Sequence, residues 1–241
     1  VFHASVGAAA LAALAASSPN VAFFGPVVLG NLHGEPSGLP VAIGSLVNTL
    51  TVMPATVILL TWDAEQRAQP VGSHEASPAA RPTGSARRNT PLAPVILAAA
   101  RQSIVWLPAL GVLGVLLRFA IPAELAGGLE LLGQSATGVA LFAAGIVIAG
   151  HRVILDRTVL ALAGLKNLVQ PALVLGALAW LGAGNQLISL AVISAALPSL
   201  VAIALFGVQY RVAETQAASV LLVSMAGSLV TLTLFIALTG T

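Results

Sequence analysis

The chain of 241 residues has no cysteine and very few charged residues, and these two absences narrow its class. Without cysteine it has no disulfide framework and no thiolate metal site. Charged residues make up 7% of the chain, whereas a soluble domain has about 25%. Hydrophobic residues make up 58%, and the mean hydropathy is +0.99. This composition is typical of an integral membrane protein.

Several functional motifs are also missing from the sequence. The formal net charge is only +2, and no basic stripe indicates nucleic-acid binding. No phosphate-binding loop and no Ser/His/Asp set is present. The four histidines are scattered and have no metal-ligand spacing (His3, His33, His74, His151). We therefore expect no catalytic residue, no metal, no cofactor and no nucleic-acid partner.

What the chain does contain is long apolar runs of about 18–25 residues, which suit helices that cross a hydrocarbon core of about 30 Å. Seven such spans are predicted, at residues 1–32, 39–62, 103–119, 131–149, 158–181, 186–208 and 217–238. A short helix at 91–102 leads into the third span, and 122–130 is predicted as a connection. Residues 63–90 are rich in Ala, Pro, Ser, Gly and Arg and are predicted to be a flexible, solvated loop. This loop separates two membrane blocks, 1–62 and 91–241.

The distribution of arginine predicts the orientation of these spans. If the connections alternate between the two sides, one side carries Arg67, Arg81, Arg87, Arg88, Arg101, Arg152, Arg157 and Arg211. The other side carries only Arg118, together with Glu35, Glu124 and Glu130. Positive charge accumulates on the cytoplasmic side of membrane proteins. We therefore expect a multi-pass protein of the bacterial cytoplasmic (inner) membrane, with the 63–90 loop inside and the C-terminus outside.

The first span is interrupted by two prolines, Pro19 and Pro26, with Asn20 and Gly25 between them. Proline removes a backbone donor and clashes with the preceding turn. The freed backbone groups are tolerated at membrane depth only where they are buried in protein or line a wet cavity. We therefore predict a helix break near residues 18–26 with a polar side chain beside it.

Pro198 interrupts the sixth span in the same way. Taken alone it is equally well explained as a kink that neighbouring groups satisfy. Two corresponding breaks in two halves of a chain are typical of an inverted-repeat transporter. The second block has five predicted spans and the first has two, so we expect a ten-helix, 5+5 protein with about three helices ahead of Val1.

Several short motifs occur in an order that resembles the auxin efflux carrier family, which includes the plant PIN auxin exporters and bacterial malonate-type permeases. The similar stretches are residues 19–34, Leu141–Gly145, the Lys166–Pro171 motif, residues 196–210 and residues 218–232. The chain departs from the family pattern at Ala22, where glycine is usual, and at Pro26, which comes one position early. The resemblance covers nearly the whole chain outside the loop.

The resemblance implies a secondary transporter that moves a small organic anion by alternating access. The substrate would be a carboxylate such as malonate or an auxin-like acid, and the protein would be a homodimer in the lipid bilayer. The coupling ion, proton or sodium, stays open. One alternative is a carrier of the bile-acid/sodium symporter type. Another is a non-transporting membrane scaffold or sensor, although a plain scaffold has no need for paired helix breaks.

Six residues near the breaks are candidate substrate-binding residues: Asn20, Phe24, Gly25, Asn48, Pro198 and Ser199. A half-helix that begins after a break presents free amides and a positive dipole end to an anion. Asn20 could donate to a carboxylate or cap the broken helix, and Gly25 would allow close approach to the backbone. Asn48 faces the cavity or bonds across a helix interface. Ser199 contacts substrate or bonds a freed carbonyl, and Phe24 lines the cavity or packs.

Lys166 is the one basic residue well inside a predicted span. Such residues are costly in a membrane and are functional candidates for that reason. With Gln170 it is a candidate for attracting the anion or for a structural role. The alternative is that its side chain snorkels to the membrane surface. No acidic residue lies deep in a predicted span, so no carboxylate-based proton relay or sodium site is visible.

Overall fold

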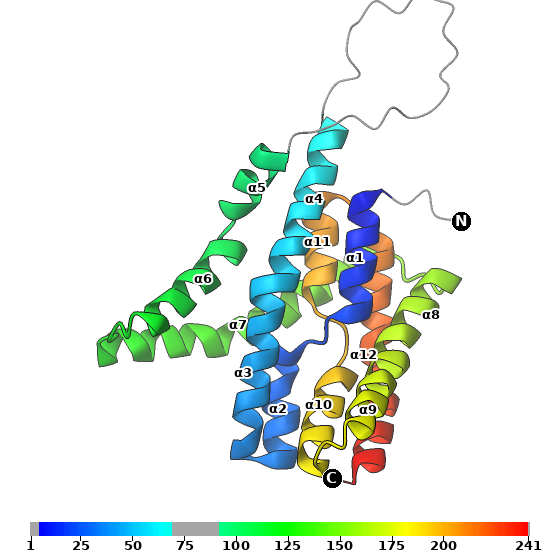
Figure 1. Cartoon of the computed structure of the whole chain (residues 1–241). Helices are drawn as coiled ribbons and strands as arrows, with labels where there is room; N and C mark the ends of the chain where they lie inside the picture. Colours follow the sequence, from blue (N-terminus) through cyan, green and yellow to red (C-terminus); the bar gives the residue numbers. More distant parts are fainter. Residues whose placement is uncertain (1–4, 69–91, 241) are drawn as a thin grey trace, which may run out of the picture.

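The computed structural model describes residues 5–68 and 92–240, and within these ranges every regular element is helical (Figure 1). The first block contains α1 (Val6–Ser17), α2 (Val21–His33), α3 (Gly38–Val47) and α4 (Met53–Ala68). The second contains α5 (Leu92–Ala100), α6 (Ser103–Leu116), α7 (Ala123–Gly150), α8 (Arg157–Gly164), α9 (Gln170–Trp180), α10 (Asn185–Ala196), α11 (Ala202–Tyr210) and α12 (Glu214–Thr239). Short π-helical segments, Asn48–Val52 and Leu165–Val169, join α3 to α4 and α8 to α9. The protein is therefore an all-α integral membrane protein.

The helices follow the predicted apolar segments in order. Four continuous helices in the described ranges are long and apolar enough to cross a membrane: Glu35–Ala68, Ala123–Gly150, Arg157–Trp180 and Glu214–Thr239. A fifth candidate is the pair α5 and α6, which is bent by 69°. The remaining two segments are each split at a break, giving α1 with α2 and α10 with α11.

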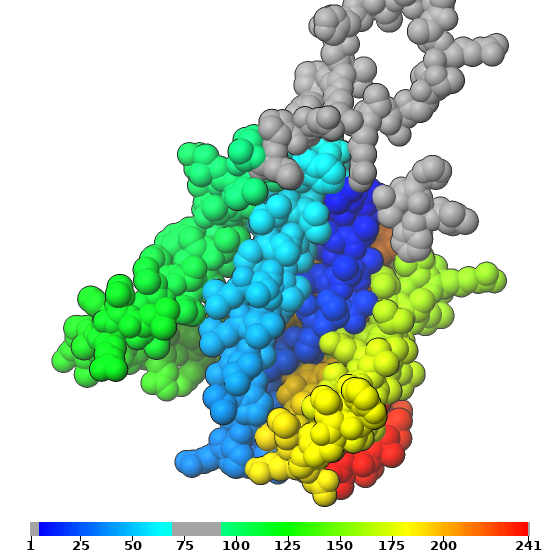
Figure 2. Space-filling view, in the orientation of Figure 1, coloured from blue at the N-terminus to red at the C-terminus, as the bar shows by residue number. Residues whose placement is uncertain are grey.

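The main core forms where α1, α4, α11 and α12 pack together. Leu14, Val57, Ile203 and Leu221 are almost completely buried there. Figure 2 shows α4 and α1 side by side on one face, with α8 on the other side of α1. Burial of such side chains contributes about 1.5–3 kcal/mol each where the alternative is water. The two broken segments therefore cross inside a packed bundle.

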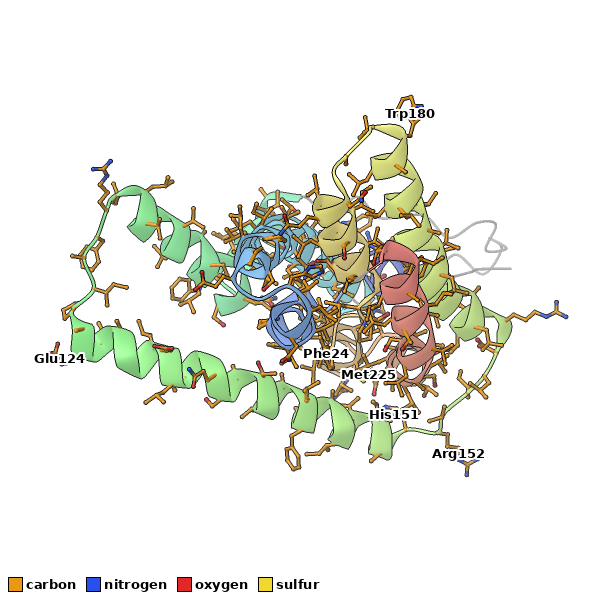
Figure 3. The ribbon with its side chains drawn as sticks, turned by 90° about the horizontal axis from the view of Figure 1, so that it is seen from below. Phe24, Glu124, His151, Arg152, Trp180 and Met225 are labelled. Carbon is orange, nitrogen blue, oxygen red and sulfur yellow. The ribbon has the colours of Figure 1, made fainter. Side chains whose placement is uncertain are left out.

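Helices α5, α6 and α7 form an arm that stands away from this bundle (Figure 1). Glu124 and His151 mark the two ends of α7 in Figure 3. The arm exposes many large apolar side chains, such as Leu116 and Phe142, at 73% and 72% of their surface. An apolar surface of this kind suits contact with lipid. The arm meets the bundle through α4, α11 and α12.

Two predicted boundaries differ from the structure. Residues 123–130 are not a connection, because α7 begins at Ala123; its N-cap is Pro122, whose φ of −52° lies in proline's fixed range. The predicted loop does not begin at residue 63, because α4 continues to Ala68. There Asp63 is buried and pairs with Arg67 at 3.0 Å. The rest of the predicted loop, 69–90, lies outside the described residues.

Pro26 is not a helix break, and that prediction is wrong. It lies inside α2, which continues through it to His33. Proline at this position removes only one intrahelical bond, the one from its own nitrogen to the carbonyl of Ala22. Both residues lie on the exposed side of the helix, and membrane helices tolerate such a loss where neighbours compensate. The first break is therefore confined to Ser18–Asn20.

His151, just beyond the end of α7, joins the arm to the start of α12. Its Nδ1 lies 2.8 Å from the carbonyl of Val147, and its Nε2 lies 3.2 Å from Oε2 of Glu214. Both neighbours are acceptors, so only the doubly protonated ring satisfies both contacts. The hydrogen bond to Val147 and then the one to Glu214 raise the pKa of His151 above 6.5.

We expect this contact to stabilise the protein at low pH and to be lost at high pH. A histidine whose folded pKa is raised contributes fully below its unfolded pKa, and the contribution disappears as the pH rises through the folded value. The difference in Tm between wild type and His151→Gln should be larger at about pH 5.5 than at about pH 8.5. A difference that is the same at both values would contradict the role of the charged ring.

Candidate functional site

The two breaks meet at the centre of the bundle and pair with each other (Figure 1). The backbone N–H of Asn20 donates to the carbonyl of Pro198 at 2.9 Å, and that of Leu200 donates to the carbonyl of Ser18 at 3.0 Å. Pro19 and Ser199 thus face each other across one antiparallel bridge. Helix α1 ends at Ser17 and α10 ends at Ala196, so the chain is non-helical at Pro19 and at Pro198. We call residues 18–20 and 197–201 the crossover.

Groups from other segments satisfy the carbonyls that the first break frees. Pro19 has no N–H to give to the carbonyl of Ala15, and Ser199 Oγ donates to that oxygen instead, at 2.9 Å. The carbonyl of Ser17 accepts from Gln170 Nε2 at 2.7 Å. Ser199 therefore bonds a freed carbonyl, which was one of its two predicted roles, and the carbonyl belongs to the opposite broken helix.

Lys166 performs the same task at the second break. Its Nζ donates to the carbonyls of Ala195 and Leu197, both at 2.7 Å, at the C-terminal end of α10. The side chain has no exposed surface. The snorkelling alternative is therefore wrong. Lys166 and Gln170 lie one turn apart on one span, and each bonds a different broken helix.

Two further residues of this network, Asn167 and Ser224, were not among the sequence candidates. Ser224 Oγ donates to Asn167 Oδ1 at 2.7 Å and accepts the backbone N–H of Ser199 at 2.9 Å. Asn167 Nδ2 donates to the carbonyl of Ser224 at 2.8 Å. Both side chains are buried. In the sequence, the only features that point to these two residues are the polar position next to Lys166 and the several serines of the last span.

Asn20 stands out because nothing satisfies its side chain. It is fully buried, and neither Oδ1 nor Nδ2 has a partner among the described residues. It occupies the N-cap position of α2 but makes no side-chain cap bond. The capping role considered for its side chain is therefore not found. An unpaired buried amide costs about 1–3 kcal/mol per group. A ligand that hydrogen-bonds to this amide would remove that cost.

The other candidates differ in their exposure and in the elements that cover them. Phe24 is half-buried one turn further along α2, and Figure 3 labels it. A Cβ on Gly25 would lie 3.1 Å from Val41 Cγ2, so α3, rather than the opposing broken helix, covers that glycine. Asn48 is half-buried in the π-helical segment, and its Oδ1 has no partner among the described residues. Pro198 is buried in the crossover.

A separate cavity of about 310 Å³ lies between α1, α8, α11 and α12. Its apolar wall runs along α1 from Ala8 to Ala15, and Asp156 and Gln216 contribute polar atoms. None of the predicted substrate-binding residues lines it. The carboxylate of Asp156 would repel an anion, which argues against this cavity as a carboxylate site.

Comparison with known proteins identifies relatives over almost the whole chain. Residues 1–236 match a family model described as "Membrane transport protein". The chain is 29% identical over 232 residues to the uncharacterized transporter YfdV of Escherichia coli (strain K12), and equally so to YfdV of Escherichia coli O157:H7 and of Shigella flexneri. These alignments cover 95% of this chain and 67% of each relative.

Proposed function

Because this chain belongs to the membrane transport protein family, we propose that it carries a small organic anion. That family is the auxin efflux carrier family of the predicted resemblance, and the chain is thus a membrane transporter. The substrate class is a carboxylate such as malonate or an auxin-like acid. The mechanism is secondary transport by alternating access around the crossover. Crossed broken helices are where carriers of this kind place their substrates.

The observation that carries this proposal is the unsatisfied amide of Asn20 at the N-terminus of α2. The Nδ2 group can donate one hydrogen bond to a carboxylate oxygen. The free N–H groups of the first turn of α2 and the positive end of its dipole add to this attraction. Phe24 and Asn48 then flank the anion, with Asn48 offering a second amide. Gly25, Pro198 and Ser199 contribute the shape of the site through backbone and break geometry.

The proposed orientation rests on the distribution of arginine, and the proposed assembly rests on the family resemblance. The arginine-rich connections lie in the cytoplasm, the C-terminus lies outside, and the protein resides in the bacterial inner membrane as a homodimer. The two halves of the carrier are inverted repeats related through the crossover. One contact supports the common side of two of these connections: Arg67 donates to the carbonyls of Tyr210 and Arg211 at 3.1 and 3.2 Å.

Uptake into vesicles tests the function. The protein, expressed from its whole reading frame and reconstituted, should take up radiolabelled malonate or an indole carboxylate in a saturable way, with or without a proton gradient. Unlabelled carboxylate should compete, whereas the matching amide should not, because it lacks the negative charge that the helix dipole attracts. Empty vesicles are the control. Uptake of neither acid, together with no binding of either by calorimetry, would overturn the proposal.

A further inference from the structure

We infer that the Lys166 ammonium is a built-in cation of the crossover that occupies the place of a coupling Na⁺, so that transport proceeds without sodium. This inference rests on the proposed transport function and names the cation at that same site. In sodium-coupled carriers, unwound backbone carbonyls and the C-terminal ends of half-helices bind the ion. Here the same kinds of oxygen, those of Ala195 and Leu197 at the end of α10, accept from Lys166 Nζ.

The position of the ammonium is fixed on both sides. Lys166 lies in the π-helical segment Leu165–Val169, a type of segment that occurs often at functional sites. The residue after Leu197 is Pro198, whose carbonyl accepts from the Asn20 N–H. The cation is therefore attached to the strand of the crossover that pairs with Asn20. The half-charge at the C-terminus of α10 favours a cation at this place.

No carboxylate neutralises this charge among the described residues. The ion pairs found there, Arg67–Asp63 and His151–Glu214, both lie elsewhere. All of the contacts of Nζ are with backbone oxygens. Dipoles alone thus hold the ammonium, and its field adds to the attraction of an anionic substrate. An ammonium that already bonds these carbonyl oxygens competes with Na⁺ for the same ligands.

The first broken helix provides the contrast. Its freed carbonyls, those of Ala15 and Ser17, are bonded by the neutral donors Ser199 and Gln170. Of the two helix ends that lie at the breaks, α1 and α10, only that of α10 receives a charged donor in the described part of the chain. The asymmetry indicates that Lys166 does more than satisfy carbonyls, because a neutral amide one turn away on the same span satisfies carbonyls equally well.

The test compares Na⁺ with choline in two assays, using wild type, Lys166→Gln, Lys166→Arg and Arg157→Gln. Arg157, at the exposed start of α8, is the matched control because it removes a positive charge from the same span without touching the crossover. One assay is malonate uptake into proteoliposomes. The other is Tm of the purified protein in detergent, which needs no transport. If no carboxylate is transported by any variant, the Tm assay still reports on Lys166.

We expect wild type, Lys166→Arg and Arg157→Gln to give the same uptake and the same Tm in both salts. Lys166→Gln should lose at least about tenfold in uptake in choline, the effect of losing one strong charged hydrogen bond. Its Tm should be lowered in choline and should rise in Na⁺ more than that of Arg157→Gln, because the vacated carbonyls then bind the ion.

Three results would overturn the inference. The first is a wild type that needs Na⁺ for uptake or gains Tm from it. The second is Lys166→Gln with full activity in choline. The third is a loss in Lys166→Gln that Na⁺ does not reverse. If Lys166→Gln does not fold, the salt dependence of wild type and Lys166→Arg decides.

Discussion

Replacing Asn20 with alanine is expected to weaken carboxylate binding at least about tenfold, equivalent to about 1.4 kcal/mol, and to leave the fold intact. The reason is that the Asn20 side chain makes no hydrogen bond to the described part of the protein, although it is fully buried. Its removal costs no internal bond, whereas a bound carboxylate would lose a donor. Calorimetric titration with malonate measures the affinity, and Tm in detergent measures the fold.

Asn31→Ala is the matched control for this prediction. Asn31 is the same residue type on the same helix, but it is exposed and its Nδ2 donates to the carbonyl of Val27. Its affinity for malonate should equal that of wild type. If Asn20→Ala binds malonate as tightly as Asn31→Ala does, Asn20 has no part in the substrate site. If Asn20→Ala instead loses its cooperative melting, the side chain has a structural partner.

Replacing Ser224 with alanine should have the opposite profile, a large loss of stability. Its Oγ joins α12 to two other segments, accepting the Ser199 N–H and donating to Asn167 Oδ1. Alanine leaves both of these buried groups unpaired, at about 1–3 kcal/mol each. For a chain of this size each kcal/mol corresponds to about 2–4 °C in Tm. We therefore expect Tm to fall by roughly 5–20 °C.

Ser228→Ala separates this network from a general effect of removing a buried hydroxyl. Ser228 is one turn further along α12, is also buried, and donates only to the carbonyl of Met225 in its own helix. Its Tm should change by no more than about 2 °C, since water or the helix itself satisfies that carbonyl. Equal losses in the two variants would show that the Ser224 contacts add nothing specific to the crossover.

The two predictions describe a crossover with unlike halves. At the second break, Lys166 and Ser224 bond the backbone, and Asn167 in turn bonds Ser224. At the start of α2, one amide is left free in a buried place. A rigid support beside an unsatisfied polar group is the arrangement expected of a preorganised binding site, because the ligand then replaces no internal contact.

The sequence alone determined the features that depend on local chemistry. Apolar runs without charge produce membrane helices whatever their neighbours are, because lipid offers the backbone no hydrogen bonds. Pro19 and Pro198 interrupt their helices because proline has no N–H, and this loss is fixed by the residue itself. The order of the motifs also identified the family. The substrate, the repeat architecture and the roles of the site residues stay predictions.

The tertiary structure decided which groups satisfy one another. Pro26 has the same chemistry as Pro19, yet it lies within the continuous helix α2, whereas the chain at Pro19 pairs with the second break. Lys166 points inward because the fold brings the carbonyls of Ala195 and Leu197 next to its Nζ, although these residues lie 29 and 31 positions further along the chain. Ser224 reaches Asn167 across 57 residues. Such pairings depend on where distant segments meet in space. The helical pattern of a sequence does not say which segments these are.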